Sequence, residues 1–294
     1  MAARSLSLHE LAAQCVYSAT PAEKLALTAD VAARFESGAV VCDDAPVSVA
    51  PLSTEPGRPD RPRRVSPRNL PRRGLGSTQG RAALIHAVAH IEFNAINLAW
   101  DAVSRFRGMP DDYYRDWVGV AVDEARHFTM LSARLAELGY AYGDFDAHDG
   151  LWEMAVKTAD SCLARMALVP RVLEARGLDV TPGMIARLRG ASDAATAAIL
   201  EVILREEVAH VAAGSRWFVW CCEREGVDPR STFENLIRRH LRGALRGPFN
   251  DEARLRAGFT EAEIAHLHDA ERDDRIFDAG EQERSRRSSG EIAA

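Results

Sequence analysis

The sequence predicts an all-α protein whose core is a four-helix bundle with additional N- and C-terminal helices. Three observations support this fold class. After Gly80, apolar residues recur at spacings of three and four, the period of an amphipathic helix. Glycine and proline divide this part of the chain into long segments. Strict alternation of apolar and polar residues, the pattern of a half-buried strand, is scarce.

Residues 1–40 form a short helical preface in this prediction. Ser7 is placed to cap a first helix, because a serine hydroxyl can accept a hydrogen bond from an amide of the first turn. Thr20, Pro21 and Glu23 together form the start signal of a second helix.

Residues 41–79 predict an extended arm, because closely spaced prolines break any helix or central strand. The arm is also rich in arginine, which suits phosphate binding. We favour the alternative that the arm packs on the core through salt bridges. The arginines concerned are Arg58, Arg61, Arg63, Arg64, Arg68, Arg72 and Arg73.

Residues 80–228 are expected to form the bundle, with helices over 80–107, 111–138, 151–176 and 193–225. Gly108 and Pro110 separate the first two helices, and Gly139 ends the second. Gly177 is expected to end the third, before a short helix that starts near Pro182. Ser192 or Asp193 is expected to cap the fourth. Residues 229–280 predict accessory helices, and residues 281–294 a flexible tail.

Composition narrows the functional classes. The 294 residues, 47% of them hydrophobic, can bury a large core, and a formal net charge of -6 argues against a general polyanion binder. We find no secretory leader and no apolar run long enough to cross a bilayer. The five scattered cysteines lack metal spacing and indicate reduced thiols. We therefore expect a cytoplasmic protein without membrane contact.

Carboxylates and imidazoles occur on the apolar stripes of the four predicted helices. A carboxylate that points into a core needs a partner. Glutamate and histidine three residues apart on a helix share a face, so each such pair delivers two ligands from one helix. The candidate metal ligands are Glu92 in the first helix, Glu124 and His127 in the second, Glu174 in the third, and Glu207 and His210 in the fourth.

The order of these six residues is more informative than any one pair. Glu124 follows Glu92 by 32 residues and Glu207 follows Glu174 by 33, which predicts two similar helical hairpins. Four carboxylates and two imidazoles are the donor set of di-iron and di-manganese bundles. We expect two iron ions, with manganese or a mixed Fe/Mn pair as alternatives. Glu263 and His266 form a third copy that lacks a partner hairpin, and a single copy is weak support for a site.

Other polar residues are expected to have roles other than direct metal binding. His86 and His90 are expected on a helix surface rather than among the ligands. His148 and Asp149 are expected to cap the third helix. A carboxylate often orients a metal-binding histidine through its second nitrogen. The candidates for that role are Asp101, Asp123 and Asp160.

Four strings resemble the ferritin-like family catalogued as domain of unknown function 455. They are Asp123-Glu-Ala-Arg-His-Phe128, Ala147-His-Asp-Gly-Leu-Trp-Glu153, Leu173-Glu-Ala-Arg-Gly-Leu-Asp179 and Gly247-Pro-Phe-Asn250. The ligand order is also similar to that of a ferritin-like tRNA hydroxylase, which oxidises an isopentenyl-type group on a modified adenosine. These resemblances imply a ferritin-like fold and metal site, but not a reaction.

The leading functional hypothesis is an oxygen-dependent oxidoreductase or hydroxylase that acts on an unidentified organic substrate. The substrate would be a small molecule or a modified nucleoside, with tRNA as one candidate, and the reaction would need an electron-donor protein or another reductant. Catalytic residues beyond the metal ligands are not identified. The alternatives are a ferroxidase or iron-handling protein, and a bundle that metal only stabilises.

Overall fold

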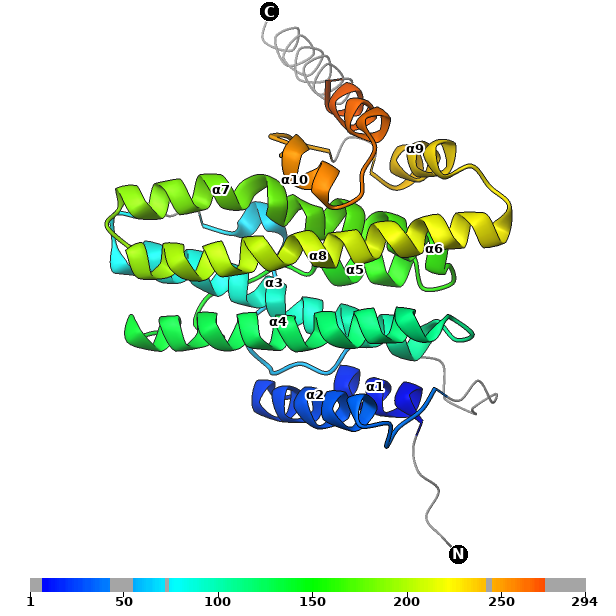
Figure 1. Cartoon of the computed structure of the whole chain (residues 1–294). Helices are drawn as coiled ribbons and strands as arrows, with labels where there is room; N and C mark the ends of the chain where they lie inside the picture. Colours follow the sequence, from blue (N-terminus) through cyan, green and yellow to red (C-terminus); the bar gives the residue numbers. More distant parts are fainter. Residues whose placement is uncertain (1–6, 43–54, 72–73, 242–244, 273–294) are drawn as a thin grey trace, which may run out of the picture. The chain divides into compact units, whose positions relative to one another are not determined.

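The computed structural model describes residues 7–42, 55–71, 74–241 and 245–272. These residues are helical, apart from loops and one isolated β-bridge between Arg64 and Ala147, which confirms the all-α class (Figure 1). Arg72, Arg73 and the predicted tail, 281–294, lie outside the described residues. The chain divides into two compact units. Unit 1 comprises Met1–Cys162 and Gly183–Glu206, and unit 2 comprises Leu163–Pro182 and Glu207–Ala294.

The helical preface forms as predicted. Ser7 caps α1 (Leu8–Tyr17) in a reciprocal pair with Glu10, in which each side chain bonds the other residue's backbone amide. Thr20 caps α2 (Pro21–Glu36) through the amide of Glu23. The buried Lys24 donates to the carbonyl oxygens of Cys15 and Val16, at 2.5 and 3.0 Å, and so caps the C-terminal end of α1.

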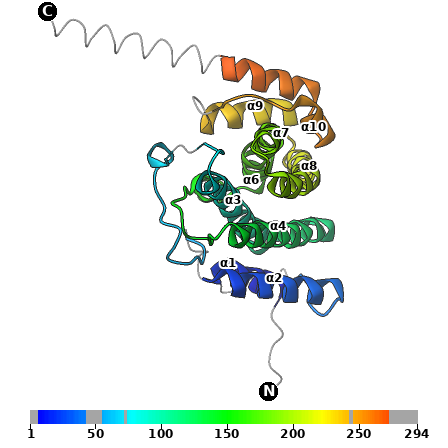
Figure 2. The same cartoon turned by 90° about the vertical axis from the view of Figure 1, so that its left-hand side faces the viewer.

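Two long helices, α3 (Thr78–Arg105) and α4 (Asp111–Glu137), pack along each other as a hairpin (Figure 1). The chain reverses at Gly108 and leaves α4 at Gly139, whose φ values of +65° and +80° suit glycine. Helix α1 packs on α3, and α2 contacts α4 (Figure 2). The sequence therefore located this hairpin to within two residues.

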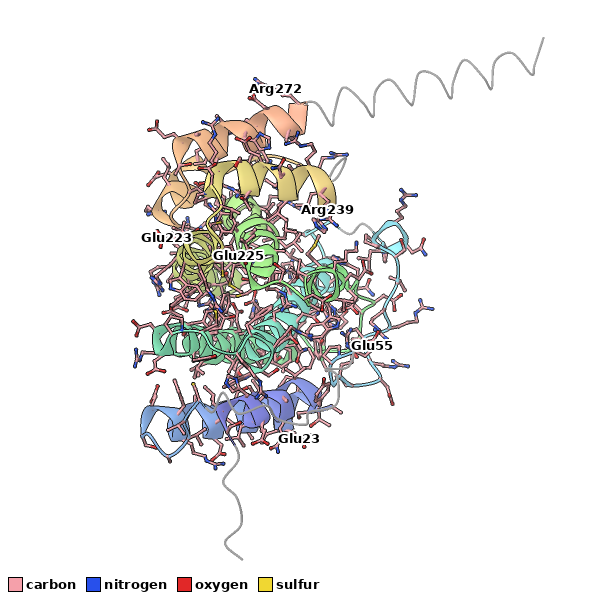
Figure 3. All side chains as sticks on the ribbon, turned by 90° about the vertical axis from the view of Figure 1, so that its right-hand side faces the viewer. Glu23, Glu55, Glu223, Glu225, Arg239 and Arg272 are labelled. Carbon is pink, nitrogen blue, oxygen red and sulfur yellow. The ribbon has the colours of Figure 1, made fainter. Side chains whose placement is uncertain are left out.

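The described part of the arm is fastened to the loop that follows α4 (Figure 2). Arg58 donates to Asp149 at 2.7 Å, and Arg63 donates to both carboxylate oxygens of Asp146. Arg64 donates to Asp149 and to Glu55, a surface residue (Figure 3). For these three arginines the packing interpretation is confirmed.

The predicted third helix, 151–176, is wrong in its details. It begins as α5 (Gly150–Lys157) and resumes as α6 (Cys162–Leu168). It then widens into η2, a π-helical turn (Val169–Glu174), before α7 (Ala175–Gly190). Gly177 does not end the helix, and Pro182 lies inside α7 rather than near the start of a new one. Buried Leu178, Leu188 and their neighbours keep α7 continuous, since packing overrides a local helix-breaking tendency.

The fourth long helix, α8 (Ala194–Glu225), agrees with its predicted range. Asp193 caps it by accepting a hydrogen bond from the amide of Thr196 at 3.0 Å. Unit 2 then adds α9 (Pro229–His240), α10 (Asp251–Arg256) and a helical segment over residues 261–272.

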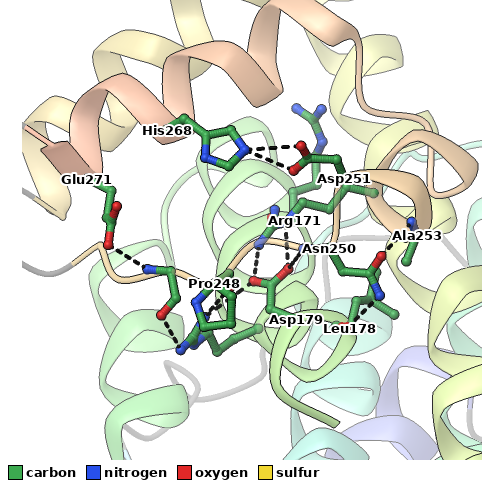
Figure 4. A network of polar contacts seen from close by, with 12 residues as sticks. Arg171, Leu178, Asp179, Pro248, Asn250, Asp251, Ala253, His268 and Glu271 are labelled. Carbon is green, nitrogen blue, oxygen red and sulfur yellow. Dashed lines mark hydrogen bonds and ion pairs between the residues drawn. The ribbon is translucent and has the colours of Figure 1, made fainter. Parts of the chain in front are cut away.

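Two of the family-like strings contact each other in unit 2 (Figure 4). Arg176 donates to the carbonyl oxygens of Gly247 and Pro248, at 3.1 and 2.9 Å. The amide of Asn250 donates to Asp179 at 2.9 Å. The loop before α10 is therefore tied to the first part of α7, although some 70 residues separate them in the sequence.

Helix α3 is the one described helix with the length and apolar composition to cross a membrane. Of its most apolar window, 78% is buried within the structure. Such burial is typical of the core helix of a folded domain. By length and composition, the expectation that no segment could cross a bilayer therefore does not hold for α3.

Candidate metal centre

Glu92, Glu124 and His127 meet between α3 and α4 in unit 1. Nδ1 of His127 lies 3.2 Å from Oε2 of Glu92 and 3.5 Å from Oε2 of Glu124. One potential ligand atom from each residue falls within a group whose members are all within 4.8 Å of one another. The three residues are 3%, 1% and 0% exposed. This arrangement can hold a metal ion away from solvent.

The helix hairpin explains why these side chains converge. Glu124 and His127 are three residues apart on α4 and share one face. Each hairpin helix also carries a phenylalanine next to its ligand, and the rings of Phe93 and Phe128 pack with centroids 5.5 Å apart. This ring contact crosses the hairpin one residue after Glu92 and one residue after His127.

The second nitrogen of His127 has a carboxylate partner that the sequence reasoning missed. Nε2 donates to Oε2 of Glu206 on α8, at 2.7 Å. Glu206 also accepts from Arg126 at 2.6 Å, and Arg126 in turn donates to Asp123 at 2.9 Å. Asp123 was a predicted partner of a ligand histidine, but it reaches His127 only through Arg126 and Glu206.

Glu206 fixes the orientation of the His127 ring. With the Nε2 proton directed at Glu206, Nδ1 faces Glu92 and Glu124, which is the nitrogen that a metal would use there. In the sequence, Glu206 is distinguished only by its position next to the candidate ligand Glu207. Adjacent positions on a helix point in different directions, so this position could not show which residue Glu206 contacts.

The ionisation of the cluster reflects its neighbours. Burial lowers the pKa of His127, but the hydrogen bonds and charges of Glu124 and Glu92 outweigh burial and raise the pKa to about 11. Burial raises the pKa of Glu206, but hydrogen bonds from His127 and Arg126 outweigh it and lower the pKa. Two buried carboxylates thus require positive charge beside them, and a divalent metal ion also supplies it.

The other three predicted ligands belong to unit 2. His210 follows Glu207 by one turn of α8, and Nδ1 of His210 lies 3.6 Å from Oε2 of Glu207. Glu174 is half-buried at the end of η2. Pro170 lies at the start of this π-helical turn, so regular helical spacing does not give the direction of Glu174. Three of the six predicted ligands therefore lie in each unit.

The third Glu-x-x-His pair has a different role, as its isolation in the sequence suggested. Glu263 accepts from Arg171 at 2.9 Å and from the amide and hydroxyl of Thr260 at 2.8 and 2.9 Å. It is an ion-pair partner and a helix cap. Nε2 of His266 is buried without a hydrogen-bond partner among the described residues.

His86 and His90 are buried rather than exposed, which corrects the expectation from their sequence positions. The loop after α4 covers them: Gly143 donates to Nε2 of His86 at 2.9 Å, and Nδ1 of His90 lies 2.9 Å from the hydroxyl of Tyr142. Burial lowers the pKa of both histidines to about 4. They are therefore neutral near pH 7.

The remaining polar candidates do not contact His127 in the described hydrogen bonds. Asp101 is buried and pairs with Arg105 one turn along α3, and Asp160 is exposed after α5. Asp149 occupies the cap position of α5, but its carboxylate binds the arm arginines instead of the helix. His148 accepts from the amide of Gly150 at 3.3 Å.

Comparisons with known proteins cover most of the chain. An "Uncharacterized protein" of Haemophilus influenzae is 39% identical over 263 residues, which is 86% of this chain and 91% of the relative. No solved structure matches the chain. The model of a family described as "Protein of unknown function (DUF455)" matches residues 17–265, a range that includes all six candidate ligands. The chain therefore belongs to the DUF455 family.

Proposed function

We propose that the protein is a ferritin-like, dinuclear metal enzyme that uses iron, or alternatively manganese, to oxidise an organic substrate with dioxygen. The observation that carries this proposal is the buried cluster of Glu92, Glu124 and His127, in which a further carboxylate holds the non-ligating nitrogen of the histidine. A purely structural cluster would not need a histidine oriented in this way.

The donor set fits the proposed metal. Carboxylate oxygen and imidazole nitrogen together suit iron and manganese, whereas a structural zinc site commonly includes thiolates. None of the five cysteines forms a disulfide, and none is among the six proposed ligands. In this proposal, the ligands are Glu92, Glu124 and His127 of unit 1, and Glu174, Glu207 and His210 of unit 2.

Iron bound by these residues would supply the oxygen and redox chemistry. The chain's own residues would hold the carboxylates out of water, fix the His127 ring through Glu206, and leave Nδ1 facing the metal position. The reaction also needs an external reductant. A small-molecule or nucleoside substrate is favoured over intact tRNA, because Arg58, Arg63 and Arg64 of the arm already bind carboxylates.

The first test is metal content and oxygen reactivity. The protein is purified anaerobically, its iron and manganese are measured, and absorbance is followed as oxygen is admitted. We expect about two metal ions per chain. The His127→Ala and His210→Ala proteins should each lose metal and the oxygen-dependent signal. His266→Ala is the matched control, because it removes the histidine of the third Glu-x-x-His pair and should change neither.

The outcomes separate the competing functions. Failure of the wild-type protein to bind iron or manganese would overturn the proposal. Iron that is oxidised and accumulates beyond two ions per chain would favour iron handling. Metal that raises the unfolding temperature but never reacts with oxygen would favour a stabilising role.

A further inference from the structure

Arg171 is a deeply buried cation in unit 2. Its side chain is 1% exposed, and its guanidinium carbon lies 4.4 Å from the ring centroids of Phe233 and Phe259 and 4.8 Å from that of Phe218. These three rings and Glu263, which accepts from Nη2 at 2.9 Å, are here called the arginine box. The rings supply cation–π contacts and Glu263 supplies the opposite charge.

Burying an arginine in this core costs free energy, because its charge is removed from water. Burial lowers its pKa despite the opposing effect of Glu263, and Nη1 has no hydrogen-bond partner among the described residues. Apolar residues of similar volume are often as stabilising as a buried ion pair. The box is therefore better explained by a requirement for defined geometry than by stability alone.

The box is built on the π-helical turn that ends at Glu174. Pro170 lacks an amide hydrogen, so the regular helical bond cannot form there, and the amide of Ala175 bonds back to the carbonyl of Pro170 in the wider π pattern. Arg171 is the next residue. Arg254 donates to the carbonyl of Arg171 at 3.4 Å and to both carboxylate oxygens of Asp179, at 3.0 and 2.7 Å.

The same turn contacts α8 one helical turn beyond His210. A Cβ atom on Gly214 would lie 2.4 Å from Cγ of Pro170, so the two helices approach more closely there than any larger residue permits. Nε of Arg171 donates to the hydroxyl of Ser215 at 3.1 Å. Arg171 therefore links the turn that precedes Glu174 to the helix that carries Glu207 and His210.

We propose that Arg171 is a positioning residue: its box holds the π-helical turn so that Glu174 is presented in register with Glu207 and His210. This inference rests on the proposed metal function. It gives the C-terminal segment a role in the metal centre, since Phe259 and Glu263 come from that segment. It also explains a cation that the proposed chemistry does not itself use.

The test compares Arg171→Met with Arg171→Lys. Methionine fills the box without charge, and lysine keeps the charge but lacks the planar fork that reaches Ser215 and Glu263 together. Manganese binding is measured by titration, and unfolding temperature is measured without metal. We expect both variants to fold. In Arg171→Met, the affinity for one of the two manganese ions should fall about 10- to 100-fold. Arg171→Lys should recover part of this affinity. Arg134→Met, which removes a largely buried arginine paired with Asp193 in unit 1, is the matched control.

The results distinguish the two proposals. If the wild-type protein binds no manganese, the metal function and this inference both fail. If the wild-type protein binds two ions and Arg171→Met binds both equally well, only the positioning role fails. Should Arg171→Met not fold, Ser215→Ala removes a single contact of the same guanidinium. If Ser215→Ala folds and binds its second manganese ion as tightly as the wild-type protein does, the inference is overturned.

Discussion

The Glu-x-x-His pair on α4 and the pair in the segment 261–272 share a spacing but have different environments. Glu124 and His127 face a third buried carboxylate, Glu92, and the outer nitrogen of the histidine is held by Glu206. Glu263 instead neutralises Arg171 and caps its own helix. The comparison shows that the motif creates a shared face, whereas the partner across that face decides whether the glutamate belongs to a metal site or an ion pair.

The largest expected effect comes from removing the anion of the second pair. Glu263→Ala leaves Arg171 buried without its counter-ion, so we expect the free energy of unfolding to fall by about 3–5 kcal/mol. Denaturant unfolding of the metal-free protein measures this change, with the exposed Glu252→Ala as control. A loss below about 1 kcal/mol would contradict the view that Glu263 serves Arg171.

A smaller effect is expected at the first pair, and it concerns metal rather than folding. Glu206→Ala removes the acceptor that orients His127, so we expect metal affinity to fall about 10- to 100-fold, or about 1.4–2.7 kcal/mol. Isothermal titration with manganese measures the affinity. Glu201→Ala removes a half-buried glutamate of α8 that pairs with Arg189 of α7, and it should leave the metal affinity unchanged. Equal affinities in both variants would show that Glu206 does not support the site.

The smallest expected effect concerns His86, whose lowered pKa contrasts with the raised pKa of another buried histidine, His127. His86 has a pKa of about 4, against an ordinary value of 6.5, because burial disfavours its charged form. Between these pH values the unfolded chain binds a proton at this position and the folded chain does not. The free energy of unfolding therefore falls as the pH decreases from 6.5 towards 4, by on the order of 1–2 kcal/mol for this residue.

The variant His86→Gln tests this contribution, because glutamine retains an acceptor for the amide of Gly143 and does not titrate. Its free energy of unfolding should decrease less than that of the wild-type protein between pH 7 and pH 4.5. Denaturant unfolding at the two pH values measures the difference. Identical pH dependence in the two proteins would count against burial as the cause of the low pKa.

Local signals in the sequence were sufficient for much of the fold. Ser7, Thr20 and Asp193 cap the helices that they were expected to cap, and Gly108 and Gly139 stand where the backbone needs a positive φ. Helical spacing also placed Glu124 and His127 on one face. These features depend on residues a few positions apart, so the sequence displays them directly.

The features that the sequence predicted wrongly depend on packing between distant residues. Helical periodicity could not anticipate the π-helical turn or the continuation of α7 through Pro182, because packing around buried Leu178 and Leu188 outweighs local preference. His86 and His90 were expected at the surface because no sequence pattern shows that the loop after α4 folds back over them.

By itself, the sequence determined the all-α class, the α3–α4 hairpin and the shared face of Glu124 and His127 on α4. Only the tertiary structure decided that Glu206 binds His127, that Glu263 pairs with Arg171, and that a π-helical turn ends at Glu174. Residues that share a helical face are related by a fixed local geometry. Partners separated by some 80 or 90 residues meet only once the helices have packed, and the energetics of that packing select them.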